Sequence, residues 1–310
     1  MRRSLLFVLA GCTVSGTTHL DAQQFPLALQ EAVQRRIAAQ PGAEVGLWFE
    51  DLVTGDTMGI ADTVTFHAAS TMKVPVMIEL FRRADAGELR LDDRIPLTNR
   101  FASIVDGSPY SLSRTDDSDG ALYARIGAPI SLRELNERMI VRSSNLATNV
   151  LIGRLDPTRV TSSARALGGA GVSVLRGVED GKAYSAGLSN TTTARGMGKL
   201  LAALERGEAA SRWATTAMRS TLMRQEFNDQ IPAGLPPGTP IAHKTGWITA
   251  TLHDAAIVYP NGQEAFVLVI LTRGIPDRTD AERLTADIAR LVWDYATRPT
   301  AVAPAASASR

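Results

Sequence analysis

Residues 70–84 read STMKVPVMIELFRRA, and this stretch decides the architecture because it joins a buried helix to a polar pair at its start. Its apolar side chains recur at helical spacing, at Met72, Val76, Met77, Leu80 and Phe81. A helix puts Ser70 and Lys73 on one face, where the lysine amine can reach the serine hydroxyl. A serine becomes a good nucleophile once a base takes its proton. The pair is therefore a candidate nucleophile and base; the structural alternative is a helix-capping serine followed by a surface lysine.

A second polar group, Ser143-Ser144-Asn145, lies between two predicted helices. Ser144 is placed to cap the helix that begins near Asn145, which is its structural interpretation. A catalytic interpretation is compatible with that one. Ser143 could pass a proton to a leaving nitrogen, and Asn145 could hold a substrate amide.

A third group, Lys244-Thr245-Gly246, ends a predicted strand. Lys244 offers a positive charge, Thr245 a hydroxyl, and Gly246 leaves room for a substrate backbone beside the strand edge. The chain has only four lysines, so a motif that requires lysine is less easily met by chance.

The remainder of the chain predicts an α+β fold whose sheet is built from both ends of the sequence. Strand-like segments occur at residues 45–52 and again after residue 239, and the middle is mostly helical, with long loops at residues 99–129 and 171–190. We expect one antiparallel sheet flanked by N- and C-terminal helices, with an inserted all-helical lobe. The expected division is a leader of residues 1–24, a sheet domain of residues 25–66 and 238–297, a helical domain of residues 67–237 that carries the nucleophile, and a disordered tail of residues 298–310.

The leader and the charge balance bear on location and partners. Arg2 and Arg3 precede a short apolar run, as in export signals, so we expect a periplasmic or secreted protein. Leu9-Ala10-Gly11-Cys12 resembles a bacterial lipobox; lipidation of Cys12 and plain cleavage further along, near Ala22, both remain open. Cys12 is the single cysteine, which excludes an intrachain disulfide. A net charge of +1 gives no reason to expect nucleic acid, and a membrane would be reached only through a lipid on Cys12.

Together, the three motifs resemble the S-x-x-K, S-D-N and K-T-G set of class A β-lactamases and penicillin-binding proteins, here in the same order along the chain. The resemblance covers residues 25–297 and is strengthened by further matches, at Phe66, Asn149, Thr191-Thr192-Thr193 and Ala233-Gly234-Leu235-Pro236. It implies a serine hydrolase that opens β-lactam rings without a cofactor or metal, and a small β-lactam or acyl-peptide substrate. It also implies an oxyanion hole made by the backbone N–H groups of Ser70 and Trp247. Repulsion between Lys73 and Lys244 is expected to lower one pKa and to help Lys73 act as a neutral base.

The sequence departs from the family at the loop before Thr191, which lacks the Glu-x-x-Leu-Asn pattern. Glu179 is the best candidate for the base that activates the deacylating water, and Asp180 is the second. Ala183 stands where the partner Asn is expected, which predicts slow hydrolysis of the acyl-enzyme. The alternative is that both carboxylates belong to a solvated acidic loop.

Two further departures concern the second motif and the substrate carboxylate. Ser144 stands where class A enzymes usually carry Asp. His253 lies nine residues after Lys244, where related enzymes often place an arginine that binds the substrate carboxylate. His253 either performs that role more weakly or is packed inside the protein.

Other functions are also conceivable for a chain with these motifs. A D-alanyl-D-alanine peptidase or esterase of the same superfamily would acylate but would deacylate β-lactams poorly. A non-catalytic binding lipoprotein is disfavoured because all three motifs are present. A Ser-His-Asp hydrolase and a zinc enzyme are disfavoured because the chain has neither a G-x-S-x-G nor an H-E-x-x-H pattern.

Overall fold

The computed structural model describes residues 24–260 and 264–298, so the leader, Cys12 and the tail from residue 299 lie outside the described residues. The strands are β1 (Glu44–Asp51), β2 (Thr57–Ile60), β3 (Phe66–His67), β4 (Arg94–Pro96), β5 (Phe101–Ala102), β6 (Pro109–Tyr110), β7 (Pro129–Ser131), β8 (Thr191–Thr192), β9 (Ile241–Ile248), β10 (Thr251–Val258) and β11 (Phe266–Arg273). The α-helices are α1 (Gln24–Ala38), α2 (Lys73–Asp85), α3 (Leu132–Val141), α4 (Asn145–Leu155), α5 (Pro157–Ala166), α6 (Gly181–Ser185), α7 (Ala194–Glu205), α8 (Arg212–Leu222) and α9 (Arg278–Ala296). Short 3-10 helices are η1 (Ala69–Met72), η2 (Gly120–Arg125) and η3 (Pro232–Gly234).

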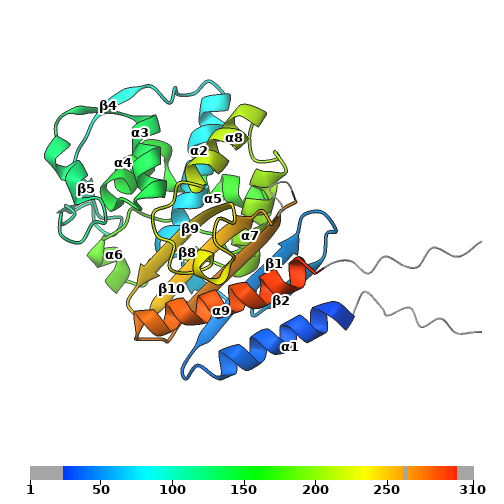
Figure 1. Ribbon diagram of the computed structural model, residues 1–310. Coiled ribbons are helices and arrows are strands. Elements are labelled where there is room, and N and C mark those ends of the chain that lie inside the picture. Colours follow the sequence, from blue (N-terminus) through cyan, green and yellow to red (C-terminus); the bar gives the residue numbers. More distant parts are fainter. Residues whose placement is uncertain (1–23, 261–263, 299–310) are drawn as a thin grey trace, which may run out of the picture.

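A five-stranded antiparallel sheet forms the base of the molecule, in the order β2-β1-β11-β10-β9 (Figure 1). Strands from the two ends of the chain therefore pair, because β1 lies directly beside β11. Strand β9 is at the edge of the sheet, where it contacts η1 and α8. This is the α+β arrangement that the sequence predicts.

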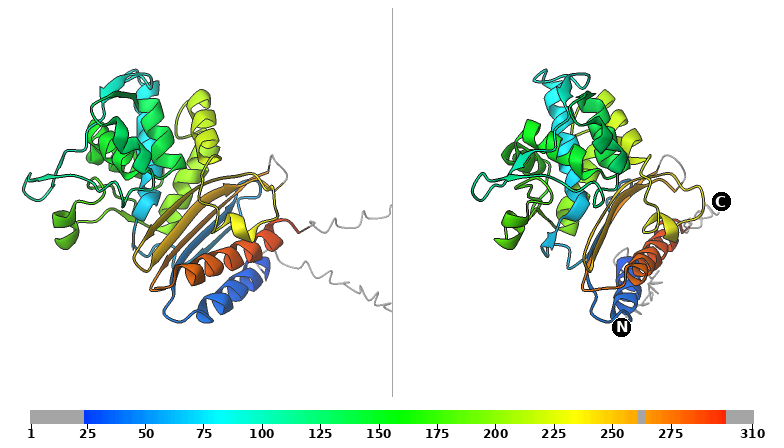
Figure 2. Two further views of the ribbon diagram at one scale, coloured as in Figure 1. Left: turned by 60° about the vertical axis from the view of Figure 1, so that its left-hand side comes forward. Right: turned by 90° about the vertical axis from the view of Figure 1, so that its left-hand side faces the viewer.

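The alternation of side chains along the strands gives the sheet two apolar faces. One face, which includes Phe49 and Ile270, packs against α1 and α9. The opposite face, which includes Trp48 and Val269, packs against α7 and is continuous with the core of the helical lobe. Figure 2 shows the sheet separating the α1–α9 pair from this lobe.

Helix α2 runs through the helical lobe and is buried along most of its length, as its apolar sequence predicts. It contacts α3, α4, α5 and α8. The chain enters α2 through β3 and η1, and β3 pairs with β8, so that Phe66 lies opposite Thr192. This pairing connects the segment just before η1 and α2 with the segment that follows the loop of residues 171–190.

Several boundaries differ from those predicted. The segment of residues 70–84 begins as the 3-10 helix η1, and α2 proper starts at Lys73. Strand β9 continues beyond Lys244 as far as Ile248. The two long loops contain short elements: β5, β6 and η2 in the first, and α6 in the second.

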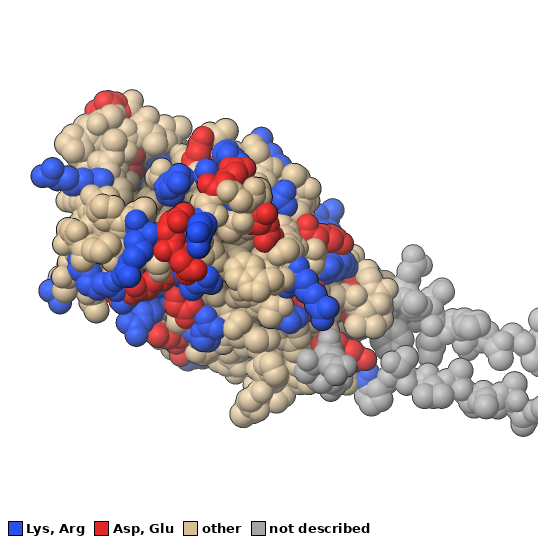
Figure 3. Space-filling model, turned by 90° about the horizontal axis from the view of Figure 1, so that it is seen from above, with Lys and Arg blue, Asp and Glu red and all other residues tan. Residues whose placement is uncertain are grey.

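Within residues 24–260 and 264–298, no helix is both long and apolar enough to span a membrane. On the face seen from above, basic and acidic side chains are interspersed, without a large area of one sign (Figure 3).

Candidate active site

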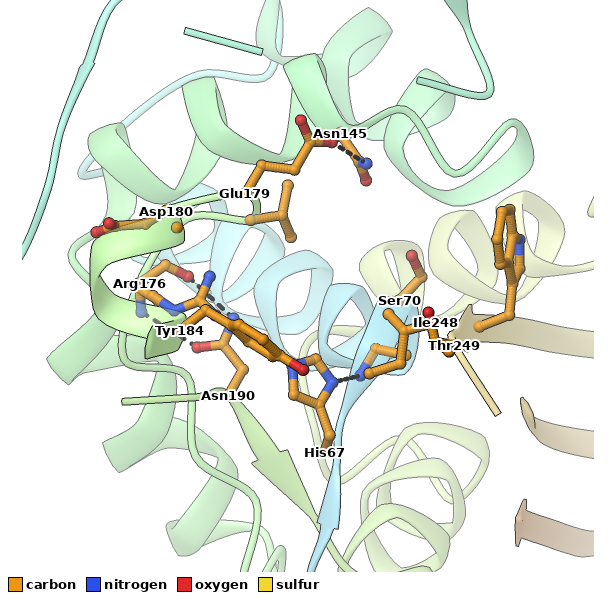
Figure 4. A pocket seen from close by; sticks show the side chains of 14 residues that line it. His67, Ser70, Asn145, Arg176, Glu179, Asp180, Tyr184, Asn190, Ile248 and Thr249 are labelled. Carbon is orange, nitrogen blue, oxygen red and sulfur yellow. Dashed lines mark hydrogen bonds between the residues drawn. The ribbon is translucent and has the colours of Figure 1, made fainter. Parts of the chain in front are cut away.

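Ser70 lies in η1, at the floor of a cavity of about 460 Å³ between the helical lobe and the end of the sheet (Figure 4). Local hydrogen bonds fix this segment. The Ala69 N–H donates to His67 Nδ1 at 3.0 Å, and the Thr71 hydroxyl donates to Ala68 O at 2.6 Å. Ala69 has a φ of 44°, a left-handed conformation that costs energy for a residue with a Cβ. The backbone is thus held in a strained shape directly before the candidate nucleophile.

The edge strand β9 packs closely against η1 at Gly246. A Cβ on Gly246 would lie 2.7 Å from Ser70 N and 3.0 Å from Thr71 N, closer than such atoms approach. Gly246 therefore allows the strand to meet the nucleophile segment, which is a packing role that differs from the substrate contact expected from the sequence. The next residue, Trp247, lines the same cavity as Ser70, and Arg278 lies 5.1 Å from its ring.

Lys73, one helical turn from Ser70, is fully buried and its amine points to the second motif. Its Nζ donates to Ser143 O at 2.6 Å, to Ser143 Oγ at 3.0 Å and to Asn145 Oδ1 at 2.9 Å. These three acceptors account for the three protons of a charged amine. The expected hydrogen bond from Lys73 to Ser70 Oγ is not among them.

Lys244 completes the cluster from the sheet side. It is also fully buried, and its Nζ donates to Ser143 Oγ at 3.1 Å and to Thr245 O at 2.9 Å. Ser143 Oγ therefore accepts from Lys73 and Lys244 at once. Because both lone pairs of this hydroxyl are occupied, its own proton is left to point elsewhere.

Burial lowers the pKa values of both lysines. The pKa of Lys73 falls to about 7, mainly through desolvation, although the negative charges of Asp117 and Glu179 act in the opposite direction. The pKa of Lys244 is lowered well below its ordinary value by burial and then by the charge of Lys73. Desolvation, rather than repulsion from Lys244, is thus the leading cause of the shift at Lys73.

The turn of the second motif is strained and well anchored. Ser143 has a φ of 58°, and Ser144 caps α4 by accepting from the Ala147 N–H at 3.3 Å, as predicted. Asp117 was not singled out in the sequence, yet its buried carboxylate accepts from the Leu146 N–H at 2.8 Å and from Ser144 Oγ at 3.4 Å. It lies in an irregular Ser/Asp-rich loop, where no periodic pattern identifies which carboxylate is buried.

Glu179 lines the cavity on the side of Asn145, whose Nδ2 donates to Glu179 Oε1 at 2.7 Å (Figure 4). Burial raises the pKa of Glu179. Its φ of 62° is again left-handed. Asn149 holds the preceding residue, because its Oδ1 accepts from the Val178 N–H at 2.6 Å and its Nδ2 donates to Val178 O at 3.0 Å.

Asp180 lies in a different environment although it is the next residue. Its carboxylate is buried and caps α6, accepting from the Ala183 N–H at 3.1 Å, the Ile104 N–H at 3.0 Å and the Ser103 hydroxyl at 2.9 Å. These bonds outweigh desolvation and lower the pKa of Asp180. Asp180 also lines the cavity, but its carboxylate is occupied by these three bonds and anchors the loop, whereas Glu179 accepts a single hydrogen bond.

His253 is not among the residues that line the cavity. The side chain is fully buried, with Nε2 against His67 O at 2.8 Å and Nδ1 accepting from the Thr272 N–H at 3.2 Å. Burial lowers its pKa to about 4, which leaves the ring uncharged at neutral pH. The packed alternative is the one that the structure supports, because a strand position alone does not reveal burial on both faces.

Another wall of the cavity was not anticipated. It comprises His67, Arg176, Tyr184 and Asn190, which Figure 4 shows together on the side away from Asn145. The His67 and Tyr184 rings meet edge to face, with centroids 6.2 Å apart. His67 lies more than a hundred positions before the loop that carries the other three residues, so only the folded chain brings them together. Across residues 24–260 and 264–298, no group of three or more His, Cys, Asp and Glu side chains is arranged to hold a metal.

Comparison with known proteins gives consistent results. The model of the beta-lactamase enzyme family matches residues 28–296. A beta-lactamase of Rhodobacter capsulatus is 32% identical over 266 residues, which are 82% of each chain. Among solved structures, a mutant of PBP-A in an acyl-enzyme complex with penicillin G is 26% identical, with a TM-score of 0.73 over 86% of this chain and 96% of that one. The beta-lactamase of Sphaerobacter thermophilus is 27% identical, with a TM-score of 0.73 over 87% of this chain and 99% of that one.

Proposed function

The chain belongs to the beta-lactamase enzyme family, and on that premise we propose that it opens β-lactam rings through an acyl-enzyme on Ser70. One observation carries this proposal: two buried lysines from different lobes, Lys73 and Lys244, converge on Ser143 Oγ beside the cavity that contains Ser70. Burying two amines costs free energy and lowers their pKa values, and strongly perturbed pKa values are concentrated at functional sites. A neutral amine next to a serine is a base that can activate it.

Acylation follows from the proton affinities of this cluster. Near neutral pH a substantial fraction of Lys73 is uncharged, and its Nζ can turn from Ser143 to take the Ser70 proton. Ser70 Oγ then attacks the lactam carbonyl, and the N–H groups of Ser70 and Trp247 stabilise the oxyanion. As the carbon–nitrogen bond breaks, Ser143 gives its free proton to the leaving nitrogen. Lys73, now protonated, restores the Ser143 proton through the 3.0 Å contact.

We assign deacylation to Glu179. Its carboxylate takes a proton from a water in the cavity while the water oxygen attacks the ester carbonyl. The ester bond to Ser70 then breaks, and Glu179 gives this proton back to Ser70 Oγ, which restores the free enzyme. A raised pKa favours such a base because it increases its affinity for the proton. The carboxylate is also bound by Asn145, which competes with the water for its oxygen. We therefore propose slower deacylation than in an enzyme with the full family pattern.

A second candidate is a peptidase-like or esterase relative that acylates readily and deacylates β-lactams poorly. The observation that favours it is the occupied Glu179 carboxylate in a loop that lacks the family pattern. The similarity to PBP-A also supports this candidate, because a mutant of that protein was solved as an acyl-enzyme complex with penicillin G. Its natural substrate would be an acyl-peptide. Export from the cytoplasm, with or without a lipid on Cys12, remains a proposal from the leader sequence.

Nitrocefin turnover and labelling by a fluorescent penicillin separate these functions in one set of samples. Turnover by the wild-type protein supports the lactamase, and stable labelling without turnover supports the peptidase-like enzyme. Mass spectrometry should place the adduct on the peptide that contains Ser70, and Ser70→Ala should abolish it. An adduct that persists in Ser70→Ala, or one on another peptide, contradicts the proposal.

A further inference from the structure

Arg176 is a buried cation in the wall of the active-site cavity. Its residue surface is only 4% exposed, and the side chain lines the same cavity as Ser70. Two of its nitrogens are used inside the protein: Nε donates to Leu188 O at 2.7 Å and Nη1 donates to Gly177 O at 2.9 Å. Nη2 makes no hydrogen bond with any residue that the structure describes, although a guanidinium has donors on all three nitrogens. Nη2 is not among the fully buried atoms without a partner, so some of its surface stays accessible where Arg176 lines the cavity.

The charge of Arg176 is not neutralised by an ion pair within the described part of the chain. The negative charge of Asp180 favours the charged form of Arg176, but the carboxylate forms no ion pair with it and accepts instead from Ser103, Ile104 and Ala183. The acceptor beside the Arg176 backbone is an amide, Asn190, whose Oδ1 accepts from the Arg176 N–H at 3.1 Å. A largely buried cation that has no hydrogen-bonded counterion is stabilised further when an anion binds beside it.

The groups around Arg176 form a wall that suits an extended acyl side chain. Tyr184 and His67 provide ring surfaces, and Val178 and Ile248 provide apolar contacts along the same cavity. Figure 4 shows Arg176, Tyr184 and His67 on one side of the cavity, with Glu179 and Asn145 on the other. His67 adds no second cation at neutral pH, because burial and the charge of Arg176 lower its pKa. Arg176 is thus the cation that this wall offers.

We propose that this wall is an anion subsite, in which Arg176 binds a carboxylate at the end of the substrate's acyl side chain. The inference deepens the proposed function, on which it rests, by naming a substrate class: acyl donors whose side chain ends in a negative charge. A carboxylate there would accept from Nη2 and compensate the buried charge, and Tyr184 would cover the aliphatic part of the chain. A neutral carboxamide of the same length could accept from Nη2 but would leave the charge of Arg176 uncompensated.

Two penicillins test the subsite, one with a glutaryl side chain and one with the corresponding glutaramide. They differ only in a terminal carboxylate or carboxamide, so every other contact is matched. Calorimetry on the Ser70→Gly protein measures their dissociation constants without acylation. We expect the glutaryl compound to bind about 10- to 100-fold more tightly, the range of a hydrogen bond to a charged group.

Two substitutions in the Ser70→Gly protein separate charge from loop structure. Arg176→Met and Arg176→Lys both lose the geometry of the bonds to Leu188 O and Gly177 O, but only the lysine keeps the charge. We expect the glutaryl preference to fall to nearly one in Arg176→Met and to persist in part in Arg176→Lys. A preference that is absent in the parent protein, unchanged in Arg176→Met, or equally lost in both variants would overturn the subsite, as would failure of both compounds to bind.

The proposed acylation is judged separately, by the Ser70 adduct in the protein with an intact Ser70. An adduct without any glutaryl preference would refute the subsite and leave the hydrolase intact. A strong preference without an adduct would refute the hydrolase and leave the subsite intact.

Discussion

Glu179 and Asp180 are adjacent carboxylates whose pKa values shift in opposite directions. Glu179 is desolvated at the cavity and accepts one hydrogen bond from a side chain, so its pKa is raised. Asp180 accepts three hydrogen bonds, two of them from backbone N–H groups, so its pKa is lowered. Environment therefore assigns different roles to two neighbouring acids.

We predict that Glu179→Gln leaves acylation largely intact and makes the adduct long-lived, because the water loses its base. Asp180→Asn should instead lower the free energy of unfolding by about 1–2 kcal/mol, because the capping carboxylate is lost, with a smaller effect on adduct lifetime. Time-resolved mass spectrometry gives the lifetime and urea titration gives the stability. The reverse result, a trapped adduct only in Asp180→Asn, would show that Glu179 is the wrong base.

The pKa of Lys73 predicts how acylation depends on pH. The uncharged amine is the active form, so the acylation rate should rise as the pH increases through about 7 and level off above it. The negative charge of Glu179 raises the pKa of Lys73, so Glu179→Gln should move this midpoint to lower pH. Quenched-flow labelling of both proteins between about pH 5 and pH 9 measures the two profiles. A rate that does not change over this range would mean that Lys73 is not the base.

The features that sequence could predict are those fixed by local spacing. Ser144 stands directly before a helix and caps it, and Lys73 begins the helix one turn after Ser70, although its amine bonds to Ser143 and Asn145 rather than to Ser70. His253 and Asp117 depend on which side chains the other strands and loops bring against them. For these residues the sequence carried no local signal of burial.

At the scale of elements, the approach of β9 to η1 joins the two lobes at the active site. The sequence predicts that Lys244-Thr245-Gly246 ends a strand. In the structure β9 continues to Ile248 and Gly246 faces the backbone of Ser70. Strand pairing with β10, as between Gly246 and His253, overrides the weak strand propensity of glycine.

Gly246→Ala should therefore harm both stability and catalysis. The added Cβ would overlap Ser70 N, so that β9 or η1 must shift, at a cost of about 1–3 kcal/mol in the free energy of unfolding. Acylation should slow as well, because the shift moves the nucleophile. The matched control is Gly153→Ala in α4, where no atom lies within 4 Å of the new Cβ and the helix should gain about 0.5–1 kcal/mol. Equal behaviour of the two variants in denaturant titrations would contradict this account.

In the whole molecule, the sheet contributes one face to each of two hydrophobic cores. Trp48 and Val269 belong to the core of the helical lobe, whereas Phe49 and Ile270 on the same strands belong to the core beneath α1 and α9. The α+β architecture could be predicted because strand-like and helical periods occupy separate parts of the sequence. The continuity of one sheet face with the helical lobe could not, because it depends on contacts between distant segments.

Because both cores share the sheet, we predict that residues 25–297 unfold as one cooperative unit rather than as a sheet domain and a helical domain. Neither core can keep its apolar surface buried once the sheet is lost. Scanning calorimetry should give a ratio of calorimetric to van't Hoff enthalpy of about one. Two resolved transitions, or a ratio near two, would support independent domains instead.

The scarcity of lysine has a practical consequence for chemical labelling. Lys73 and Lys244 are fully buried, whereas the side chains of Lys182 and Lys199 are 55% and 37% exposed. Amine-reactive dyes should therefore couple to the second pair and spare the first. Lys199→Arg, which can keep the ion pair with Glu50, leaves Lys182 as the reactive side-chain amine of the described surface. A fluorophore on Lys182, which lies in α6 between the cavity-lining residues Gly181 and Tyr184, should report binding events by a change in emission without any tag or introduced cysteine.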